Sequence, residues 1–196
     1  MSLEQIHQLA SLAQDRYQEG QLLVIAIDGS GGAGKTTLCQ ALAVEIEQWA
    51  PLQVLKLDDF YHSLDAVQRA QLQHGQARRA YFDERDFKQK IMQPLSQGLS
   101  ASYQVIYWLK GASDQTVKIL PRGVLLVDGV FSFSKPLREL VQLSVFVDTP
   151  LELRHQRLIA RPQLTIDWVH HWQVTEAWHH EHEQTAKASE FVLIGR

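Results

Sequence analysis

The segment from Gly29 to Thr36 carries the clearest chemical pattern in this 196-residue sequence, because "GSGGAGKT" fits G-x-x-x-x-G-K-[ST]. The apolar run "LLVIAI" at 22–27 precedes it, and a helical pattern begins near Lys35. A Gly-rich turn between a strand and a helix points backbone N–H groups at a polyphosphate, and the helix N-terminus adds positive potential. The sequence therefore predicts a binding site for a nucleoside triphosphate.

Individual residues of this segment have distinct expected roles. Lys35 would reach the β and γ phosphates, Thr36 would ligate Mg²⁺, and Thr37 would contact a further phosphate. ATP and Mg²⁺ are the expected cofactors, since the sequence contains no Asn and so lacks the Asn-Lys-x-Asp motif of GTP-specific switch proteins. The expected nucleotide-binding residues are Gly29, Ser30, Gly31, Gly32, Ala33, Gly34, Lys35, Thr36 and Thr37.

Two further sites hold carboxylates at the ends of apolar runs. Asp58 and Asp59 follow "VLKL" at 54–57, where a kinase for an alcohol needs a carboxylate to orient the hydroxyl and accept its proton. Successive residues point to opposite sides, so only one of the two is expected to face the phosphate. Asp128 follows "VLLV", and an unpaired charge there would be costly, so Mg²⁺ or its bound water is the expected partner.

Basic residues gather on a helix predicted to start at Pro150. Thr149 and Glu152 are expected to form a capping box, with Pro150 at the first helical position. Three arginines then follow at i, i+3 and i+7 on one face, and they suit the charge that develops on a transferred phosphoryl group; a solvated helix face is the alternative. The three arginines are Arg154, Arg157 and Arg161.

The elements that must position these residues form an α/β pattern. Short, continuous β-branched runs alternate with helical patterns, which is typical of a parallel sheet covered on both faces. The predicted strands are 22–27, 54–57, 124–127, 144–147 and 191–194, and the predicted helices are 34–49, 63–74, 84–97 and one from 150. This is the strand–loop–helix context of a P-loop NTPase fold.

Two segments stand outside that alternation. Residues 103–108 and 116–120 flank "LKGASDQ" and predict an antiparallel hairpin inserted within 100–121. Residues 2–18 predict an amphipathic helix, within an N-terminal segment 1–20, that packs within one chain or between two copies of a homo-oligomer. The whole chain, 1–196, is expected to be one kinase-sized domain.

Composition limits the partners and the compartment. With 45% apolar residues, 21% charged residues and a net charge of −3, the chain fits the globular range and offers no basic surface for nucleic acid. It has one cysteine, Cys39, and neither a signal peptide nor a membrane-spanning stretch is evident. The expectation is a cytoplasmic protein with a small-molecule partner and no contact with nucleic acid or membrane.

The motifs taken together carry a family resemblance. "IDGSGGAGKTTL", "DDFY", "YFDERDF", "VDGVF" and "VFVDTPLELRHQRLIAR" resemble, in order and spacing over about 22–195, the uridine kinase and phosphoribulokinase group of P-loop kinases. The resemblance implies that Asp58 is the catalytic aspartate and that Tyr61 shapes the acceptor site. It also implies that Asp83 holds ribose hydroxyls, that Tyr107 lies in a hairpin closing over the base, and that Asp128 replaces a family Glu.

The substrate is the most open part of this interpretation. Trp108 follows Tyr107, where it could stack on a base or fill a small pocket. A nucleoside such as uridine or cytidine is the first expectation for the acceptor; pantothenate, a nicotinamide nucleoside and a sugar phosphate are alternatives. A regulatory P-loop ATPase without an acceptor is the alternative from another class.

Three further features of the sequence are weak functional signals. The histidine-rich tail at 167–184 favours a packed Trp stripe with a solvated His/Glu face over a metal site. Glu176 could reach the cleft, but no role is assigned to it. Arg78 and Arg79 could bind an anionic acceptor, and surface charge is the favoured interpretation.

Overall fold

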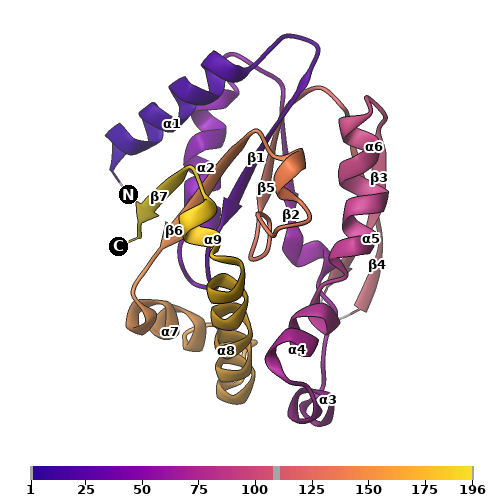
Figure 1. Cartoon of the computed structure of the whole chain (residues 1–196), viewed down its shortest axis with the longest axis vertical. Helices are drawn as coiled ribbons and strands as arrows, with labels where there is room; N and C mark the ends of the chain where they lie inside the picture. The colour runs from indigo at the N-terminus through magenta and orange to yellow at the C-terminus, as the bar shows by residue number, and fades with distance from the viewer. Residues whose placement is uncertain (1, 108–110, 196) are drawn as a thin grey trace.

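A computed structural model describes residues 2–107 and 111–195. Its centre is a parallel sheet of five strands in the order β2-β5-β1-β6-β7, which confirms the predicted α/β class (Figure 1). The strands are β1 (Leu22–Asp28), β2 (Leu52–Lys56), β5 (Gly123–Asp128), β6 (Leu143–Asp148) and β7 (Phe191–Ile194).

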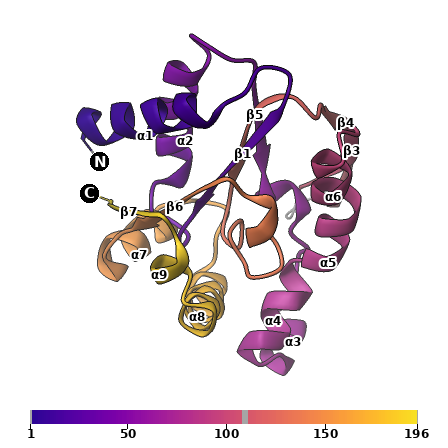
Figure 2. The ribbon, with the colours of Figure 1, turned by 45° about the horizontal axis from the view of Figure 1, so that its top comes forward.

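Both faces of the sheet are buried, which explains why its central strands are continuous apolar runs rather than alternating ones. Alternate residues of β1 join different cores: Leu23 and Ile25 pack with α1 (Leu3–Arg16) and α2 (Lys35–Ile46). Val24 instead packs with residues from the other helices and the hairpin. Figure 2 shows α1 and α2 together on one side of the sheet, away from α8.

The remaining helices cover the second face and the carboxyl ends of the strands. They are α3 (Ala66–Gln71), α4 (His74–Tyr81), α5 (Glu84–Phe87), α6 (Gln93–Ser96), α7 (Leu151–Ile159), α8 (Ile166–Glu183) and α9 (Thr185–Ala188). Short 3₁₀ segments occupy Leu57–Phe60 and Arg138–Leu140, and a π turn at Lys88–Met92 joins α5 to α6.

One predicted helix, 63–74, is wrong in its bounds, because two short helices with separate caps occupy this region. Asp65 and Gln68 form the capping box of α3, and the chain leaves the helix at Leu72, which is extended. Gln73 and Gln76 then form reciprocal hydrogen bonds at the start of α4. Each new set of caps satisfies free backbone N–H groups and so starts a helix afresh.

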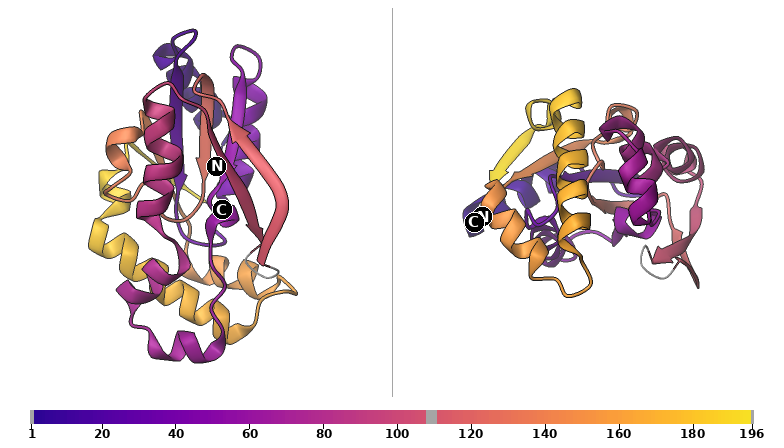
Figure 3. Two further views of the ribbon diagram at one scale, coloured as in Figure 1. Left: turned by 90° about the vertical axis from the view of Figure 1, so that its right-hand side faces the viewer. Right: turned by 90° about the horizontal axis from the view of Figure 1, so that it is seen from below.

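The predicted hairpin is confirmed and stands apart from the main sheet (Figure 3). Its strands are β3 (Ala101–Tyr107) and β4 (Gly111–Ile119), so β4 starts earlier than expected. The rings of Phe60 and Tyr103 lie 4.4 Å apart and attach β3 to the 3₁₀ segment after β2. The hairpin therefore contacts the segment that carries Asp58.

The predicted N-terminal helix is present as α1. Ser2 and Gln5 form its capping box, and its buried side chains Leu9, Ala10 and Ala13 pack in the core beneath α2. No helix among the described residues has the length and apolar character needed to cross a membrane.

Truncating a side chain on the buried face of α2 should cost more stability than truncating one on its exposed face. Leu42 is 1% exposed and Val44 is 63% exposed. We expect Leu42→Ala to lower the free energy of unfolding by about 2–5 kcal/mol, since it removes buried methyl groups and leaves a cavity. Val44→Ala on the same helix should change it by less than about 0.5 kcal/mol. Urea denaturation of both variants checks this, and equal losses would contradict the assigned burial.

Candidate active site

The predicted phosphate-binding loop connects β1 to α2 and requires glycine at positions where the backbone is left-handed or crowded. Gly29 has φ +135°, and a Cβ there would lie 2.5 Å from the Val147 carbonyl oxygen. Gly32 has φ +76°, and its Cβ would lie 2.8 Å from the Arg154 carbonyl oxygen. The loop thus lies directly against β6 and α7, which hold it in shape.

Lys35 and Thr36 lie at the start of α2, as predicted. The Lys35 ammonium donates hydrogen bonds to the carbonyl oxygens of Gly29 (2.8 Å) and Ser30 (3.0 Å), and the residue is 8% exposed. The Thr36 hydroxyl donates to the Asp128 carboxylate over 2.8 Å. These contacts unite the loop after β1 with the end of β5, its neighbour in the sheet.

Asp28 is a buried carboxylate that the sequence analysis did not assign. It accepts hydrogen bonds from the backbone N–H groups of Gly29 (2.6 Å), Phe131 (3.2 Å) and Phe133 (2.8 Å). Complete burial raises the pKa of Asp28 to about 6, against the lowering effect of these N–H donors and of the Lys35 charge. Its position directly after an apolar strand was the available signal, the same one that singled out Asp58 and Asp128.

Asp58 and Asp59 have different environments, as predicted, although they lie in a 3₁₀ segment and not in a strand whose residues alternate. Asp58 is exposed to a large cavity that the phosphate loop also lines. Asp59 does not line this cavity, and its carboxylate accepts a hydrogen bond from the Tyr103 hydroxyl (3.2 Å) of the hairpin. Surrounding protein desolvates the Asp58 carboxylate and raises its pKa, while the Lys35 and Arg161 charges oppose this rise.

The cavity has a volume of about 800 Å³ and joins the phosphate loop to an aromatic wall. Tyr61 lines it as predicted, with its hydroxyl held by the Val130 carbonyl oxygen at 2.6 Å. Trp168 and Trp172 of α8 also line it, and their rings stack with centroids 5.4 Å apart. The predicted Trp stripe is therefore packed, but it also forms a wall of the cavity. Lining residues without an assigned role include Lys56, His62, Tyr81, Gln163 and Leu164.

The three predicted arginines do not all reach the cavity. Arg157 and Arg161 line it, and Arg157 also donates to the Gly32 carbonyl oxygen at 2.9 Å. Arg154 is not among the lining residues; its guanidinium donates to the Thr149 carbonyl oxygen and to Glu176, each over 2.9 Å.

The capping box predicted for α7 is wrong. The helix begins at Leu151, with Pro150 as its cap residue and no side-chain hydrogen bond at the cap. The Thr149 hydroxyl instead donates to the Ala33 carbonyl oxygen over 2.8 Å. A buried contact with the phosphate loop has replaced the local cap.

Glu176 is a second buried carboxylate with no role assigned from the sequence. It is 0% exposed, and it accepts hydrogen bonds from the Gly31 N–H (2.7 Å) and from Arg154. Burial raises its pKa to about 7, opposed by the Gly31 N–H and by the Lys35 and Arg154 charges. A carboxylate from α8 thus reaches the phosphate loop.

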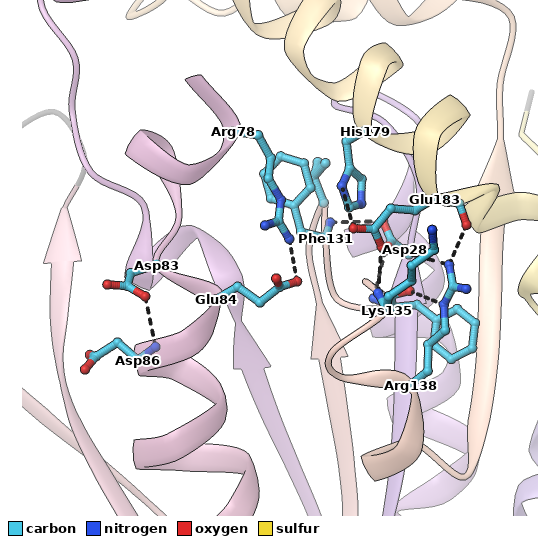
Figure 4. A network of polar contacts seen from close by, with 12 residues as sticks. Asp28, Arg78, Asp83, Glu84, Asp86, Phe131, Lys135, Arg138, His179 and Glu183 are labelled. Carbon is cyan, nitrogen blue, oxygen red and sulfur yellow. Dashed lines mark hydrogen bonds and ion pairs between the residues drawn. The ribbon is translucent and has the colours of Figure 1, made fainter. Parts of the chain in front are cut away.

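Of the remaining predicted acceptor residues, Asp83 is the one whose side chain the structure describes. Asp83 is exposed and does not line the cavity; its carboxylate accepts from the Asp86 N–H (2.9 Å) at the start of α5 (Figure 4). The backbone of Tyr107 ends β3, while Trp108 lies outside the described residues.

Arg78 is buried, which contradicts the favoured interpretation of surface charge, whereas Arg79 is exposed. The Arg78 guanidinium pairs with Glu84 and lies 5.4 Å from the centre of the Phe131 ring (Figure 4). This side chain therefore has a structural partner. Within the described parts of the chain, no three His, Cys, Asp or Glu side chains are grouped so that they could hold a metal ion.

His179 also contacts the Phe131 ring, at 4.6 Å between ring centroids, and is 0% exposed. Burial, aided by the positive charges of Arg78 and Arg138, lowers its pKa to about 2. Native His179 is consequently neutral near pH 7.

This burial predicts a pH-dependent contribution to stability. Because the native pKa of His179 is lower than the unfolded one, the unfolded chain binds the extra proton, and the contribution of this residue falls as pH drops below about 6.5. Between pH 7 and pH 5 we expect His179→Leu to gain about 2 kcal/mol in unfolding free energy relative to wild type. Urea denaturation at both pH values measures this, and a pH-independent difference would contradict it.

The site as a whole defines a class of protein: a P-loop nucleotide-binding fold in which one cavity joins the phosphate loop to a carboxylate and an aromatic wall. The model of the phosphoribulokinase / uridine kinase family matches residues 24–165. The chain belongs to this family, which consists of P-loop small-molecule kinases that transfer phosphate from ATP.

Individual relatives are distant. The chain is 26% identical over 140 residues to a uridine kinase of Borrelia duttonii (strain Ly), covering 70% of this chain and 66% of the relative. It is 28% identical over 149 residues to a uridine kinase of Latilactobacillus sakei subsp. sakei (strain 23K), covering 71% and 66%. The chain thus spans just under two thirds of the length of these relatives.

The fold has a counterpart among solved structures. A possible uridine kinase from Bacillus stearothermophilus superposes with a TM-score of 0.74 at 20% identity, and the match covers 97% of each chain. At this identity the likeness supports the fold alone.

Proposed function

We propose that this protein is an ATP- and magnesium-dependent kinase that transfers the γ-phosphate to a hydroxyl of a small metabolite, with a nucleoside such as uridine or cytidine as the acceptor. The observation that carries this proposal is that one cavity is lined both by the phosphate loop with Lys35 and by Asp58. An acceptor hydroxyl and a terminal phosphate can meet there.

In the proposed reaction Asp58 is the general base. Its carboxylate orients the acceptor hydroxyl and takes its proton while the oxygen bonds to the γ-phosphorus. The bond from that phosphorus to the β–γ bridging oxygen breaks, and ADP leaves. Lys35, Arg157 and Arg161 line the same cavity and would stabilise the charge on the transferring group.

The residues present fit a magnesium ion. Thr36 offers a hydroxyl oxygen, and Asp128 a carboxylate oxygen 2.8 Å from it; oxygen ligands of this kind suit Mg²⁺. Bound there, the ion would neutralise charge on the β and γ phosphates. Asp28, by contrast, is engaged by three backbone N–H donors and acts as a structural anchor.

Two observations support a nucleoside acceptor. Tyr61, Tyr81 and Trp168 line the cavity and offer aromatic surfaces against which a planar base can pack. The relatives described above are named uridine kinases. The placement of Asp83 outside the cavity argues against its expected contact with the ribose hydroxyls, and contacts of Tyr107 and Trp108 with the base stay predictions.

Steady-state ADP release with ATP and magnesium tests the reaction and the base together. The acceptor panel contains nucleosides, pantothenate, a nicotinamide nucleoside and phosphorylated sugars. We expect one nucleoside to stimulate release by wild type, and Asp58→Asn to lower kcat by about a hundredfold or more, because a positioned base is lost. Asp59→Asn is the matched control, since an amide oxygen at this position can still accept from Tyr103, and it should retain most of the activity.

Two results would count against the proposal. Stimulation only by a non-nucleoside would overturn the acceptor and leave the kinase reaction intact. Release that no acceptor stimulates, and that Asp58→Asn leaves unchanged, would favour a regulatory ATPase.

The environment of Asp58 also predicts the acid limb of the pH profile. Desolvation raises its pKa, and the base acts only when ionised. We therefore expect kcat/KM to begin falling at a higher pH than it would for an ordinary exposed aspartate, whose pKa is about 3.9. Rates from pH 4 to 8 with the stimulating acceptor measure this, provided that the enzyme remains folded by circular dichroism. A decline in kcat/KM with an apparent pKa at or below about 3.9, the ordinary value for aspartate, would contradict the assignment.

A further inference from the structure

Glu176 lies in the middle of α8, far along the chain from the phosphate loop, yet it contacts that loop directly. One carboxylate oxygen accepts the Gly31 N–H at 2.7 Å, and the other accepts from the Arg154 guanidinium at 2.9 Å. The Trp172 indole N–H provides a further hydrogen bond. A single fully buried side chain thus joins the nucleotide loop, α7 and the aromatic wall of the cavity.

The packing around Gly31 is consistent with a permanent contact. A Cβ on Gly31 would lie 3.0 Å from the Trp172 indole nitrogen and 3.3 Å from the Glu176 carboxylate. Even a methyl group would crowd these atoms, so glycine permits this close approach. The requirement for glycine at this second variable position of the loop therefore comes from α8 and not from the phosphate alone.

A carboxylate this close to a polyphosphate site needs its charge balanced. Arg154 forms the ion pair with Glu176, and Lys35 contributes a further positive charge. His180, one turn further along α8, has its pKa lowered to about 3 by burial and by the same two cations, and therefore stays neutral. Arg154 thus compensates the carboxylate, while Arg157 and Arg161 line the cavity.

We propose that Glu176 is a positioning residue of this kinase: its carboxylate holds the Gly31 N–H and the Arg154 guanidinium together and so fixes the phosphate loop in its nucleotide-binding shape. Arg154 then acts on the loop through Glu176 and not on the transferring phosphate. This inference rests on the nucleotide-binding half of the proposed function and is independent of the acceptor.

Equilibrium binding of ATP with magnesium tests the proposal without any acceptor. We expect Glu176→Ala to raise the Kd for ATP at least tenfold, because the loop loses its anchor. Glu176→Gln keeps an oxygen that can accept from Gly31 and should restore at least half of the lost affinity on a logarithmic scale. Arg154→Met, which leaves the carboxylate without its cation, should raise the Kd in the same direction and serves if Glu176→Ala does not fold.

Glu183→Ala on the same helix is the matched control. Glu183 also accepts a loop N–H, that of Lys135 at 2.6 Å, and also lies near an arginine, Arg138 (Figure 4). Its side-chain partners among the described residues, Lys135, Arg138 and His179, all lie outside the phosphate loop. It should lower the melting temperature and leave the Kd for ATP within twofold of wild type.

If Glu176 had a purely structural role, Glu176→Ala would change the melting temperature and leave the Kd for ATP unchanged. The proposal is overturned if Glu176→Ala binds ATP within twofold of wild type, or if Glu183→Ala weakens binding as much. A wild-type protein that does not bind ATP would overturn the proposed function itself, so the two failures are distinguishable.

Discussion

The buried carboxylate of Asp28 is the interaction on which the rest of the site depends. It ends the central strand, and its three hydrogen bonds to the N–H groups of Gly29, Phe131 and Phe133 join the loop after β1 to the loop after β5. Without these donors the carboxylate would be costly to bury, and without the carboxylate three buried N–H groups would lack a partner. The contact therefore fixes where the phosphate loop begins.

The sheet order turns this local contact into a site. β5 lies between β1 and β2, so the residues that follow these three parallel strands meet at one edge. Asp128 ends β5 beside Thr36, and the segment after β2 carries Asp58 into the cavity. Burial raises the pKa of Asp28 and of Asp58, the charges of Asp128 and Asp59 add to the rise at Asp58, and the Lys35 charge opposes the rise at both. The strand order and the charge distribution thus both place Lys35 at the centre of the site.

Features with local causes could be predicted from the sequence. The loop at Gly29–Thr36 and the five strands follow from glycine spacing and strand periodicity. The different environments of Asp58 and Asp59 were also expected, but both residues lie in a 3₁₀ turn and not in a strand. The arginine helix could be predicted only as a helix, because the partners of Arg154 and Thr149 lie on elements distant in the sequence. Periodicity specifies which residues share a face, but it does not specify which side chain another element places against that face.

Helix α8 is the clearest case of this limit. Its pattern of Trp, His and Glu has almost no helical amphipathicity, since one side meets the sheet and another meets the loop and the cavity. Trp172 is buried and Trp168 is half-buried. Tryptophans that the sequence pattern predicts as core residues therefore also form the cavity wall. The sequence allowed Glu176 to reach the cleft but assigned it no role, and its burial between Arg154 and the Gly31 N–H could not be predicted. The phosphate loop is typical of the family. Helix α8 contacts this loop through Glu176 and also forms part of the cavity wall.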